Sequence, residues 1–379
     1  MDFSLTPEQE LLKKSAKEFA KKELEPLAAT LDKEHRFPLE NLKKLGELGY
    51  LGMGVPERYG GIGADALSYA LVMEALSYAC ASTATSVSVQ NSLVNDILVK
   101  FGNEEQKQTY LTQLATGAQI GAFALSEPES GSDAGALRTT ATLSGKHYAL
   151  NGSKMWITNA GFADVFMVLA STDPQSKHRG ISCFIVPKDT PGFSVGKEED
   201  KLGIRGTSTC EIHFSKARVP ITNLVGEEGM GFKIAMATLN SGRIGIAAQA
   251  LGIAQAAFDE ALNYAQDREA FGQKISQFQS IQFKLAEMKA RIAGARLLVY
   301  KAAWKKDTGQ GYATDSAIAK LVASELASEV ADQALQIHGG YGYIRDYKVE
   351  RLYRDARITR IYEGTSEIQK LVIARSLLA

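Results

Sequence analysis

The chain has 379 residues, of which 45% are hydrophobic and 23% are charged, so it has enough apolar material for a folded core and too little charge bias for disorder. Its 43 Lys and Arg residues balance its 43 Asp and Glu residues. This zero net charge argues against a nucleic-acid or anionic-membrane binder that depends on bulk charge.

The sequence contains no targeting, membrane, disulfide or metal signature. No stretch approaches the roughly 18 apolar residues of a membrane span, and the first residues lack a basic and an apolar targeting segment. The three cysteines lie far apart with no CxxC spacing, and the five histidines show no ligand spacing. We therefore expect a soluble cytoplasmic protein without a bound metal ion.

The first third of the chain is predicted to be helical. Thr6 is expected to cap the first helix, with Pro7 in its first turn and Gln9 closing a capping box. Apolar residues follow at three- and four-residue spacing, as on a helix with one buried face. Further helices are predicted over residues 38–48, over one run from 65 to 101, and over 103–114.

The middle of the chain, from about residue 117 to 225, is predicted to form short antiparallel strands. It holds five of the nine prolines, which would break long helices, and its Val-, Ile- and Phe-rich runs are mostly bounded by Gly, Asp or Pro. Because no helix separates these runs, a parallel sheet is not expected. Strands are predicted over 165–169, 180–186 and 210–214.

The last part of the chain is predicted to be a bundle of long helices. No proline follows Pro220, and periodic Ala/Leu/Lys/Glu-rich runs cover residues 231–267, 280–308 and 313–337. The fold class is therefore mainly α with a central β-domain. We place an N-terminal helical domain at 1–119, an antiparallel β-domain at 120–228 and a helical bundle at 229–379.

A basic run near the C-terminus ends at a Glu-Gly junction that is a candidate catalytic site. We expect this run to be a helix that breaks at Gly364, with Thr365 opening the next helix. Beside Ile361 and Tyr362, the Glu363 carboxyl could be partly desolvated, which would raise its pKa toward that of a useful general base. A solvated glutamate at a helix boundary is the alternative that the local sequence leaves open.

Two other segments are candidates for ligand binding. The loop at 125–135 is dense in hydroxyls and small residues, and its backbone amides could cradle an anion or a heterocycle, although an ordinary surface turn has the same composition. Trp156 and Thr158 alternate along a predicted strand and could both face a ring. Core packing would explain Trp156 equally well.

Five motifs in order along the chain resemble the acyl-CoA dehydrogenase family. Within that family the chain is most similar to bacterial short-chain members of the butyryl-CoA type. The resemblance implies a helical domain, a central β-domain and a C-terminal four-helix bundle. The motifs are FALSEPxSGSDAG from Phe123, MWITN from Met155, DRxAFGQ from Asp267, QIHGGYGY from Gln336 and IYEGTSEIQ from Ile361.

The resemblance implies FAD as the cofactor. In the family a neighbouring subunit completes each FAD site, which implies a homotetramer built from dimers. A guanidinium such as that of Arg268 can neutralise a pyrophosphate. Flavin-holding positions match Phe123, Leu125, Ser126, Ser132, Trp156, Ile157 and Thr158, with Thr158 near the reactive N5 edge; positions that reach a neighbour's cofactor match Arg268, Gln279, Gln336, Ile337, His338, Gly339 and Gly340; and positions on the dinucleotide of the same subunit match Thr365, Ser366 and Glu367.

The implied activity is an oxidoreductase step of fatty acid β-oxidation. A short-chain acyl-CoA thioester would lose hydrogen across its α- and β-carbons to give the trans-2-enoyl-CoA, and electrons would pass to an electron-transferring flavoprotein. Glu363 matches the catalytic base, which removes the α-proton while hydride leaves the β-carbon. Its backbone N–H and a flavin ribityl hydroxyl match the donors to the thioester oxygen. Some branches carry the base at the position of Gly242, where glycine cannot serve.

The acyl-CoA site is also implied by matching positions. These are Ser132, Asn240, Arg243 and Gly364. Close relatives often have Asp where Asn240 stands, so the contact of this residue with the pantetheine is an open point. The alternatives are a flavin monooxygenase or nitroalkane-type oxidase on the same fold, which lack a Glu in a Tyr-Glu-Gly-Thr setting, and a non-catalytic flavin-binding helical protein.

Overall fold

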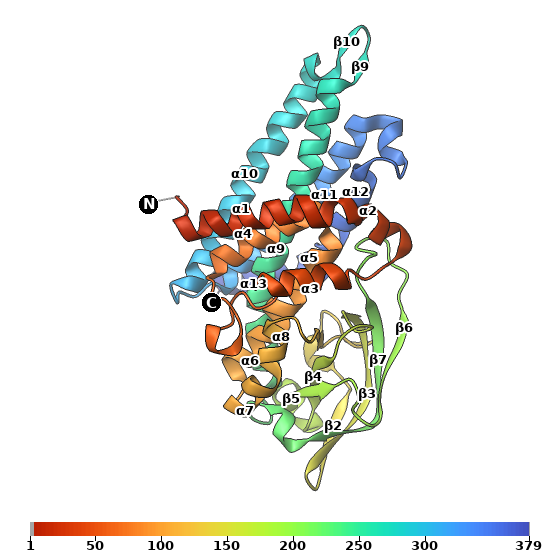
Figure 1. Cartoon of the computed structure of the whole chain (residues 1–379). Helices are drawn as coiled ribbons and strands as arrows, with labels where there is room; N and C mark the ends of the chain where they lie inside the picture. The colour runs from red at the N-terminus through yellow and green to blue at the C-terminus, as the bar shows by residue number, and fades with distance from the viewer. Residues whose placement is uncertain (1–3, 379) are drawn as a thin grey trace.

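The computed structural model of the chain describes residues 4–378. Helices occupy the chain up to residue 115, strands lie between 121 and 225, and long helices follow from 231 onward (Figure 1). The predicted fold class, mainly α with a central β-domain, is confirmed. The outer ends of the first and third predicted domains, residues 1–3 and 379, lie outside the described residues.

The first helix begins as the sequence predicts. Thr6 caps α1 (Pro7–Phe19), and its side chain and that of Gln9 form the expected reciprocal capping box. Asn103 and Gln106 form a second capping box at α7. The remaining helices of this part are α2 (Glu25–Glu34), α3 (Leu39–Glu47), α4 (Ala66–Ala79), α5 (Ala81–Ser88), α6 (Asp96–Phe101), α7 (Glu104–Gln106) and α8 (Thr112–Ala115), with π-helical turns at Ala20–Leu24, Val89–Asn95 and Lys107–Leu111.

The prediction of one helical run from 65 to 101 is wrong. The chain is extended at Cys80, which separates α4 from α5, and a π-helical turn follows at Val89–Asn95. In that turn Asn91 donates to the Tyr50 carbonyl at 2.8 Å, and Asn95 donates to the Leu51 carbonyl at 2.8 Å. These hydrogen bonds join segments about forty residues apart, so helical periodicity gave no sign of them.

The middle of the chain forms one main sheet. The strand order is β6-β7-β3-β2-β4-β5-β8. Most pairs are antiparallel, but β1 pairs in parallel with β4, which corrects the expectation of a purely antiparallel sheet. The β2–β3 hairpin lies between β1 and β4 in sequence and serves as the crossover in place of a helix. The strands are β1 (Gly121–Ala124), β2 (Thr140–Ser144), β3 (His147–Thr158), β4 (Val165–Ser171), β5 (Ile181–Pro187), β6 (Phe193–Glu198), β7 (Thr209–Pro220) and β8 (Leu224–Val225).

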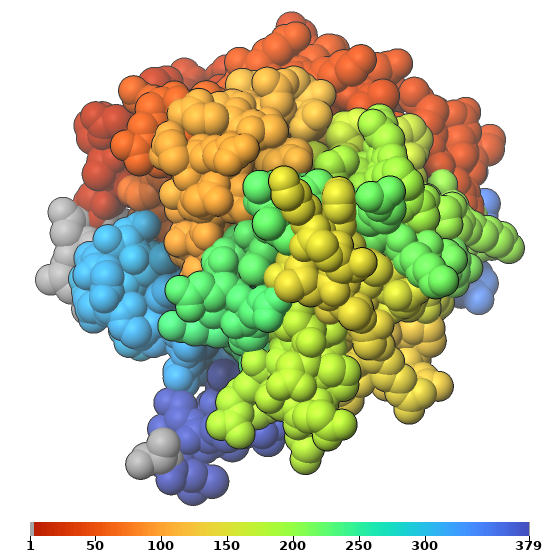
Figure 2. Space-filling view, turned by 90° about the horizontal axis from the view of Figure 1, so that it is seen from below, coloured from red at the N-terminus to blue at the C-terminus, as the bar shows by residue number. Residues whose placement is uncertain are grey.

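The C-terminal helices share one hydrophobic core with the N-terminal helices, one face of the sheet has a core of its own, and its other face packs against helices of both parts. The β9–β10 hairpin (Glu269–Ala270 and Gln273–Lys274) caps the end of the bundle that points away from the sheet (Figure 1). Seen from the sheet end, α13 emerges beside the strands (Figure 2). The helices are α9 (Gly231–Asp267), α10 (Gln279–Asp307), α11 (Ala313–His338), α12 (Lys348–Ile358) and α13 (Ser366–Leu378).

One boundary in this part differs from the prediction. The basic helix α12 ends at Ile358 rather than at Gly364, and residues 359–365 form a turn that leads into α13. The Thr359 hydroxyl donates to the Ala356 carbonyl at 2.7 Å and so competes with continuation of the helix.

No helix within residues 4–378 is both long and apolar enough to cross a membrane. Across the same described span, no three His, Cys, Asp or Glu side chains converge where they could hold a metal ion. All three cysteines are buried and unpaired.

Candidate active site

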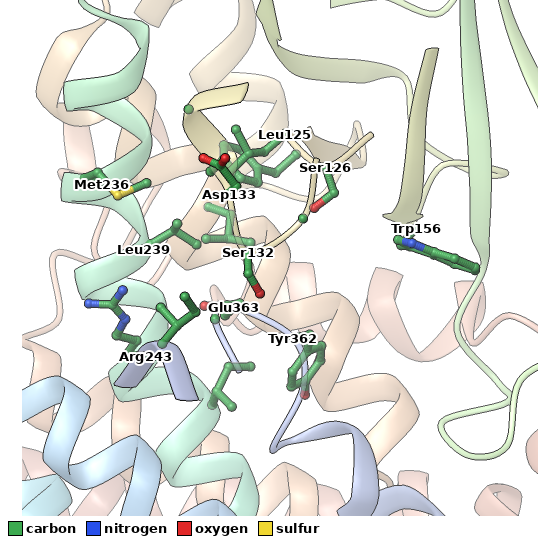
Figure 3. Close-up of a pocket in the computed structure, with 18 of the residues that line it drawn as sticks. Leu125, Ser126, Ser132, Asp133, Trp156, Met236, Leu239, Arg243, Tyr362 and Glu363 are labelled. Atoms are coloured by element: carbon green, nitrogen blue, oxygen red, sulfur yellow. The ribbon is translucent and has the colours of Figure 1, made fainter. Parts of the chain in front are cut away.

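A cavity of about 640 Å³ lies where the three parts of the chain meet. Its walls come from α5 and the π-helical turn after it, from the loop behind β1, from the end of β3, from α9, and from the turn and helix at the C-terminus. Figure 3 shows Glu363 near the centre, with Arg243 on one side, Tyr362 on the other and Trp156 farther off at the end of a strand.

The cavity brings together ten of the residues that the sequence marked, although they are spread over 240 positions. Phe123 to Ser132 come from the first motif, Trp156 to Thr158 from the second, and Glu363 and Gly364 from the last. The ten are Phe123, Leu125, Ser126, Ser132, Trp156, Ile157, Thr158, Arg243, Glu363 and Gly364.

The loop of the first motif is held against β3 by a buried ion pair that the sequence analysis missed. Lys154 donates to Glu127 Oε1 at 2.7 Å and to the Leu125 carbonyl at 3.1 Å. The backbone N–H groups of Arg138 and Thr139 also donate to the Glu127 carboxylate. Glu127 stood inside the motif, but its partner lies 27 residues away, and only the fold brings the two together.

Trp156 lies at an irregularity in β3 and lines the edge of the cavity. The pairing of β3 with β7 shifts register between Lys154 and Ile157, and Trp156 has a left-handed backbone with φ of 63°. The side chain is 60% exposed, so core packing does not explain it. An exposed indole at a cavity mouth offers a flat apolar face to a planar ring.

Glu363 lies in the turn between α12 and α13 with a left-handed backbone, φ of 51°, and Gly364 follows with φ of 92°. The residue is only partly buried because it opens onto the cavity, but its Oε2 is buried without a hydrogen-bond partner. Burial raises the pKa of this carboxyl to about 7, against the opposing charges of Lys320 and Arg243. The alternative of a solvated glutamate is therefore wrong.

The α9 helix makes room for this carboxyl at Gly242. A Cβ atom at that position would lie far inside van der Waals contact with Glu363 Oε2. One residue further on, Arg243 is buried and donates to Asn240 Oδ1 at 2.7 Å, while its Nε has no partner. Asn240 does not line the cavity, so its contact is with Arg243.

A polar network lies behind one wall of the cavity, and the sequence analysis assigned it no role. The Tyr362 hydroxyl donates to the fully buried Gln249. Gln249 in turn donates to Thr85 Oγ1 at 2.8 Å and to the Ala81 carbonyl at 3.1 Å. Tyr362 and Thr85 line the cavity, so this network is part of its wall.

The remaining predicted cofactor residues lie elsewhere. Five of them line a separate hollow of about 500 Å³ at the hairpin end of the bundle, namely Arg268, Ile337, His338, Gly339 and Gly340. Gln279 and Gln336 are exposed and line neither hollow.

At the start of α13, three further predicted cofactor residues lie next to the cavity but do not line it. Thr365 Oγ1 accepts a hydrogen bond from the Ile368 N–H, and Ser366 donates to Glu325 at 2.6 Å. Glu367 is exposed. In one chain the predicted cofactor residues therefore lie in two regions, at or beside the Glu363 cavity and at the hairpin end of the bundle.

Three family models match the chain: acyl-CoA dehydrogenase N-terminal domain over residues 6–118, middle domain over 122–217 and C-terminal domain over 229–378. The chain is 51% identical over 374 residues to the short-chain specific acyl-CoA dehydrogenase of Clostridium acetobutylicum, with 99% of each chain covered. It is 49% identical over 380 residues to the acryloyl-CoA reductase (NADH) of Anaerotignum propionicum, with 100% of this chain and 96% of the relative covered.

Solved structures show the same similarity over the full length. The butyryl-CoA dehydrogenase from Megasphaera elsdenii matches with a TM-score of 0.98 and 47% identity. A chain of the structure reported as "Electron transferring flavoprotein of Acidaminococcus fermentans: Towards a mechanism of flavin-based electron bifurcation" matches with a TM-score of 0.99 and 49% identity. Both matches cover 100% of this chain and 100% of the other.

Proposed function

Because the chain belongs to the acyl-CoA dehydrogenase family, we propose that it oxidises a short-chain acyl-CoA to the trans-2-enoyl-CoA, with Glu363 as the base and an electron-transferring flavoprotein as the electron acceptor. The chain is an acyl-CoA dehydrogenase and uses FAD, as the family does. The observation that carries the assignment of the base is the buried, unpartnered Oε2 of Glu363.

The residues around the cavity fit a flavin. The exposed indole of Trp156 can cover a planar ring, and the hydroxyl-bearing Ser126 and Thr158 line the same cavity and can hydrogen-bond to the ring edge. We therefore assign Phe123 to Ser126, Ser132 and Trp156 to Thr158 to the flavin. When bound, FAD supplies the two-electron acceptor for the hydride that leaves the β-carbon.

Glu363 supplies the proton acceptor. Its Oε2 is buried against Gly242 without a donor, and a pKa of about 7 is close to the value at which a general base works best near neutral pH. The backbone N–H of Glu363 makes no hydrogen bond within residues 4–378. It is therefore available to the thioester oxygen, where negative charge develops as the α-proton leaves.

The polar network behind the cavity supports a short acyl chain. A longer chain would have to displace the Tyr362, Gln249 and Thr85 hydrogen bonds and leave buried polar groups unpaired, which costs about 1–3 kcal/mol for each group. The identity to a short-chain specific dehydrogenase supports the same range.

The direction of the reaction needs its own test. A relative named as a reductase is 49% identical to this chain. By microscopic reversibility, a carboxyl with a pKa of about 7 can also return the proton to the α-carbon. Reduction of a short 2-enoyl-CoA is therefore the second candidate function. The structural match reported with an electron-transferring flavoprotein supports that class of partner in either direction.

We further propose a homotetramer in which a neighbour's Arg268 hollow completes each cofactor site. The supporting observation is that Arg268 and residues 337–340 lie outside the Glu363 cavity of their own chain. Phe271, at the tip of the same hairpin, is 95% exposed, an apolar surface of the kind that a second copy covers. A light-scattering mass of one chain for the FAD-loaded protein would contradict this assembly.

The test is anaerobic mixing of the FAD-loaded protein with butyryl-CoA, followed by flavin absorbance. We expect rapid bleaching with butyryl-CoA and much slower bleaching with palmitoyl-CoA. Glu363→Gln should slow bleaching by about 10²–10⁴-fold or more, because loss of a general base typically has this effect. The variant should keep its FAD, since the flavin contacts assigned above lie on other residues. Bleaching by Glu363→Gln within about tenfold of the wild-type rate would exclude Glu363 as the base.

A further inference from the structure

Lys320, on α11, is a fully buried lysine without an ion-pair partner among the described residues. Its Nζ donates to the Gly364 carbonyl at 2.6 Å. Burial of an ammonium group costs several kcal/mol unless something offsets it. No sequence motif singled out this residue, and the mechanism above does not use it.

The charge of Lys320 acts most strongly on Glu363. Burial lowers the pKa of Lys320 to about 8, and the nearby groups that affect it are, in order, Glu363, Arg243, Glu325 and Glu367. Glu325 is already paired with Arg360 at 2.8 Å, and Glu367 is exposed to solvent. The remaining buried carboxylate is that of the proposed base.

From the side of Glu363, the charged groups that face it are two cations. These are Lys320 from α11 and Arg243 from α9, and both lower the pKa of the carboxyl. Tyr69 from α4 and Tyr362 from the same turn are also near, but burial raises the pKa of both phenols far above neutral, so they carry no charge.

Two donors hold the same backbone carbonyl beside this base. Lys320 and Gln369 both donate to the Gly364 oxygen, at 2.6 and 2.8 Å, and Gln369 also donates to the Glu363 carbonyl at 3.3 Å. Glu363 and Gly364 both have positive φ, so the turn needs such anchors to persist. Gln369 holds the turn without a charge, whereas Lys320 holds it with one.

We propose that Lys320 is a positioning residue for the base: it fixes the Glu363–Gly364 turn through the Gly364 carbonyl, and its buried positive charge keeps the Glu363 carboxylate ionised. This inference rests on the proposed role of Glu363. A carboxyl buried among apolar groups takes up a proton, and a protonated carboxyl cannot accept one from the substrate. Lys320 would oppose that outcome without touching the substrate.

The direct test is the titration of Glu363 in the FAD-loaded protein without substrate. Its carboxyl stretch is followed by infrared difference spectroscopy, with Glu363→Gln as the blank. Wild type should titrate near pH 7. Lys320→Met should raise the midpoint by about 1 unit, since loss of a nearby opposite charge has this effect. Gln369→Met removes bonds to the same carbonyl without a change in charge, and should leave the midpoint in place.

The rate of flavin bleaching by butyryl-CoA gives a second readout. A midpoint raised by about 1 unit lowers the ionised fraction at pH 7 about fivefold, so Lys320→Met should lose about that much rate at pH 7. This charge-dependent part of the loss should disappear by pH 9, where Glu363 is ionised in both proteins and Lys320 itself, with a pKa of about 8, is mostly neutral. Any loss from the missing bond to the Gly364 carbonyl should remain at every pH. Gln369→Met should instead lose rate equally at all pH values.

An unchanged Glu363 midpoint in Lys320→Met, or a rate loss that is the same at pH 7 and pH 9, would overturn the proposal and leave Lys320 as a structural residue. If Lys320→Met does not fold, Lys320→Gln keeps a donor without the charge and should show the same shift in midpoint. Failure of the proposed function has a different signature, because Glu363→Gln would then still bleach rapidly.

Discussion

Lys154 and Lys320 are both fully buried, and burial lowers the pKa of both to about 8, yet their surroundings differ. Lys154 lies 2.7 Å from the carboxylate of Glu127 in the sheet region. Lys320 lies under the catalytic turn and binds a backbone carbonyl. Two buried lysines with similarly lowered pKa values are therefore compensated for their burial in different ways.

The two carboxylates beside these lysines differ in the same way. Burial raises the pKa of Glu127, but Lys154 and the hydrogen bonds from Thr139 and Arg138 outweigh it, and the net pKa is lowered. Burial dominates at Glu363, whose pKa is raised. Because its carboxylate is fully hydrogen-bonded, Glu127 fixes the 125–135 loop to β3. An unpartnered oxygen makes Glu363 a group that can exchange a proton, at a cost in stability.

The first test of this comparison removes Lys154 from its ion pair with Glu127. Lys154→Met leaves the Glu127 charge buried and unpaired, so we expect a loss of about 3–5 kcal/mol in the free energy of unfolding, measured by denaturant titration. Retention of FAD should fall too, because the loop from Leu125 to Gly135 loses its anchor to β3. Lys320→Met, which strands no paired carboxylate, should cost clearly less.

The matched control is the double variant Lys154→Met/Glu127→Leu. Replacement of both members of a buried pair by apolar residues is often neutral, so the double variant should recover most of the lost stability. If Lys154→Met is as stable as wild type, the ion pair does not stabilise the fold, and the contrast with the catalytic turn does not hold.

The sequence predicted those features that depend on neighbouring residues. The capping box at Thr6, and the α9 helix over residues 231–267, follow from local chemistry and appear as expected. The break at Cys80 and the parallel pairing of β1 with β4 depend on contacts between distant segments, which periodicity does not report.

The site shows the same division. Motif residues on three separate segments meet in one cavity, as the resemblance implied. Lys320 and Gln249 were not predicted, because a lysine or glutamine on a helix normally faces solvent, and only the packing of α9 and α11 buries these two. Gln369 stood within the last motif, but its two bonds to the catalytic turn depend on the way α13 folds back.

The second test measures how much the ionised Glu363 carboxylate lowers the free energy of unfolding. The pKa of Glu363 is about 7 in the folded protein, whereas the ordinary value is 4.5. A raised carboxyl pKa means that the stabilising contribution is complete below pH 4.5 and is lost as the pH rises through 7. Glu363→Gln, which never ionises, should therefore gain stability relative to wild type over this range.

The expected gain is about 3 kcal/mol at pH 7 and above, since each pKa unit corresponds to about 1.4 kcal/mol. It is measured as the difference between the two unfolding free energies at a series of pH values. A difference that does not change with pH would mean that folding does not raise the pKa of the Glu363 carboxyl. Lys154→Met gives the opposite outcome at neutral pH, a loss rather than a gain.

The third and smallest effect on stability is expected at Gly242, which contacts Glu363 without contributing any charge. A Cβ at this position would overlap Glu363 Oε2, the far end of a side chain that can swing away. Gly242→Ala should therefore cost only about 1 kcal/mol in stability, the low end for overpacking. The rate of flavin bleaching should fall up to about 10²-fold, since displacement of a catalytic group by about 1 Å can have that effect.

Gly294 in α10 is the control, because a Cβ there would meet no atom within 4 Å. Gly294→Ala should leave the rate unchanged and gain about 0.5–1 kcal/mol from the reduced backbone entropy of the unfolded chain. If Gly242→Ala keeps the wild-type rate, the carboxyl need not occupy the space beside α9 to act as a base. If Gly242→Ala bleaches the flavin more slowly while its stability is nearly unchanged, the position of the Glu363 carboxyl matters as well as its charge. Both properties then distinguish the catalytic turn from the Lys154–Glu127 ion pair.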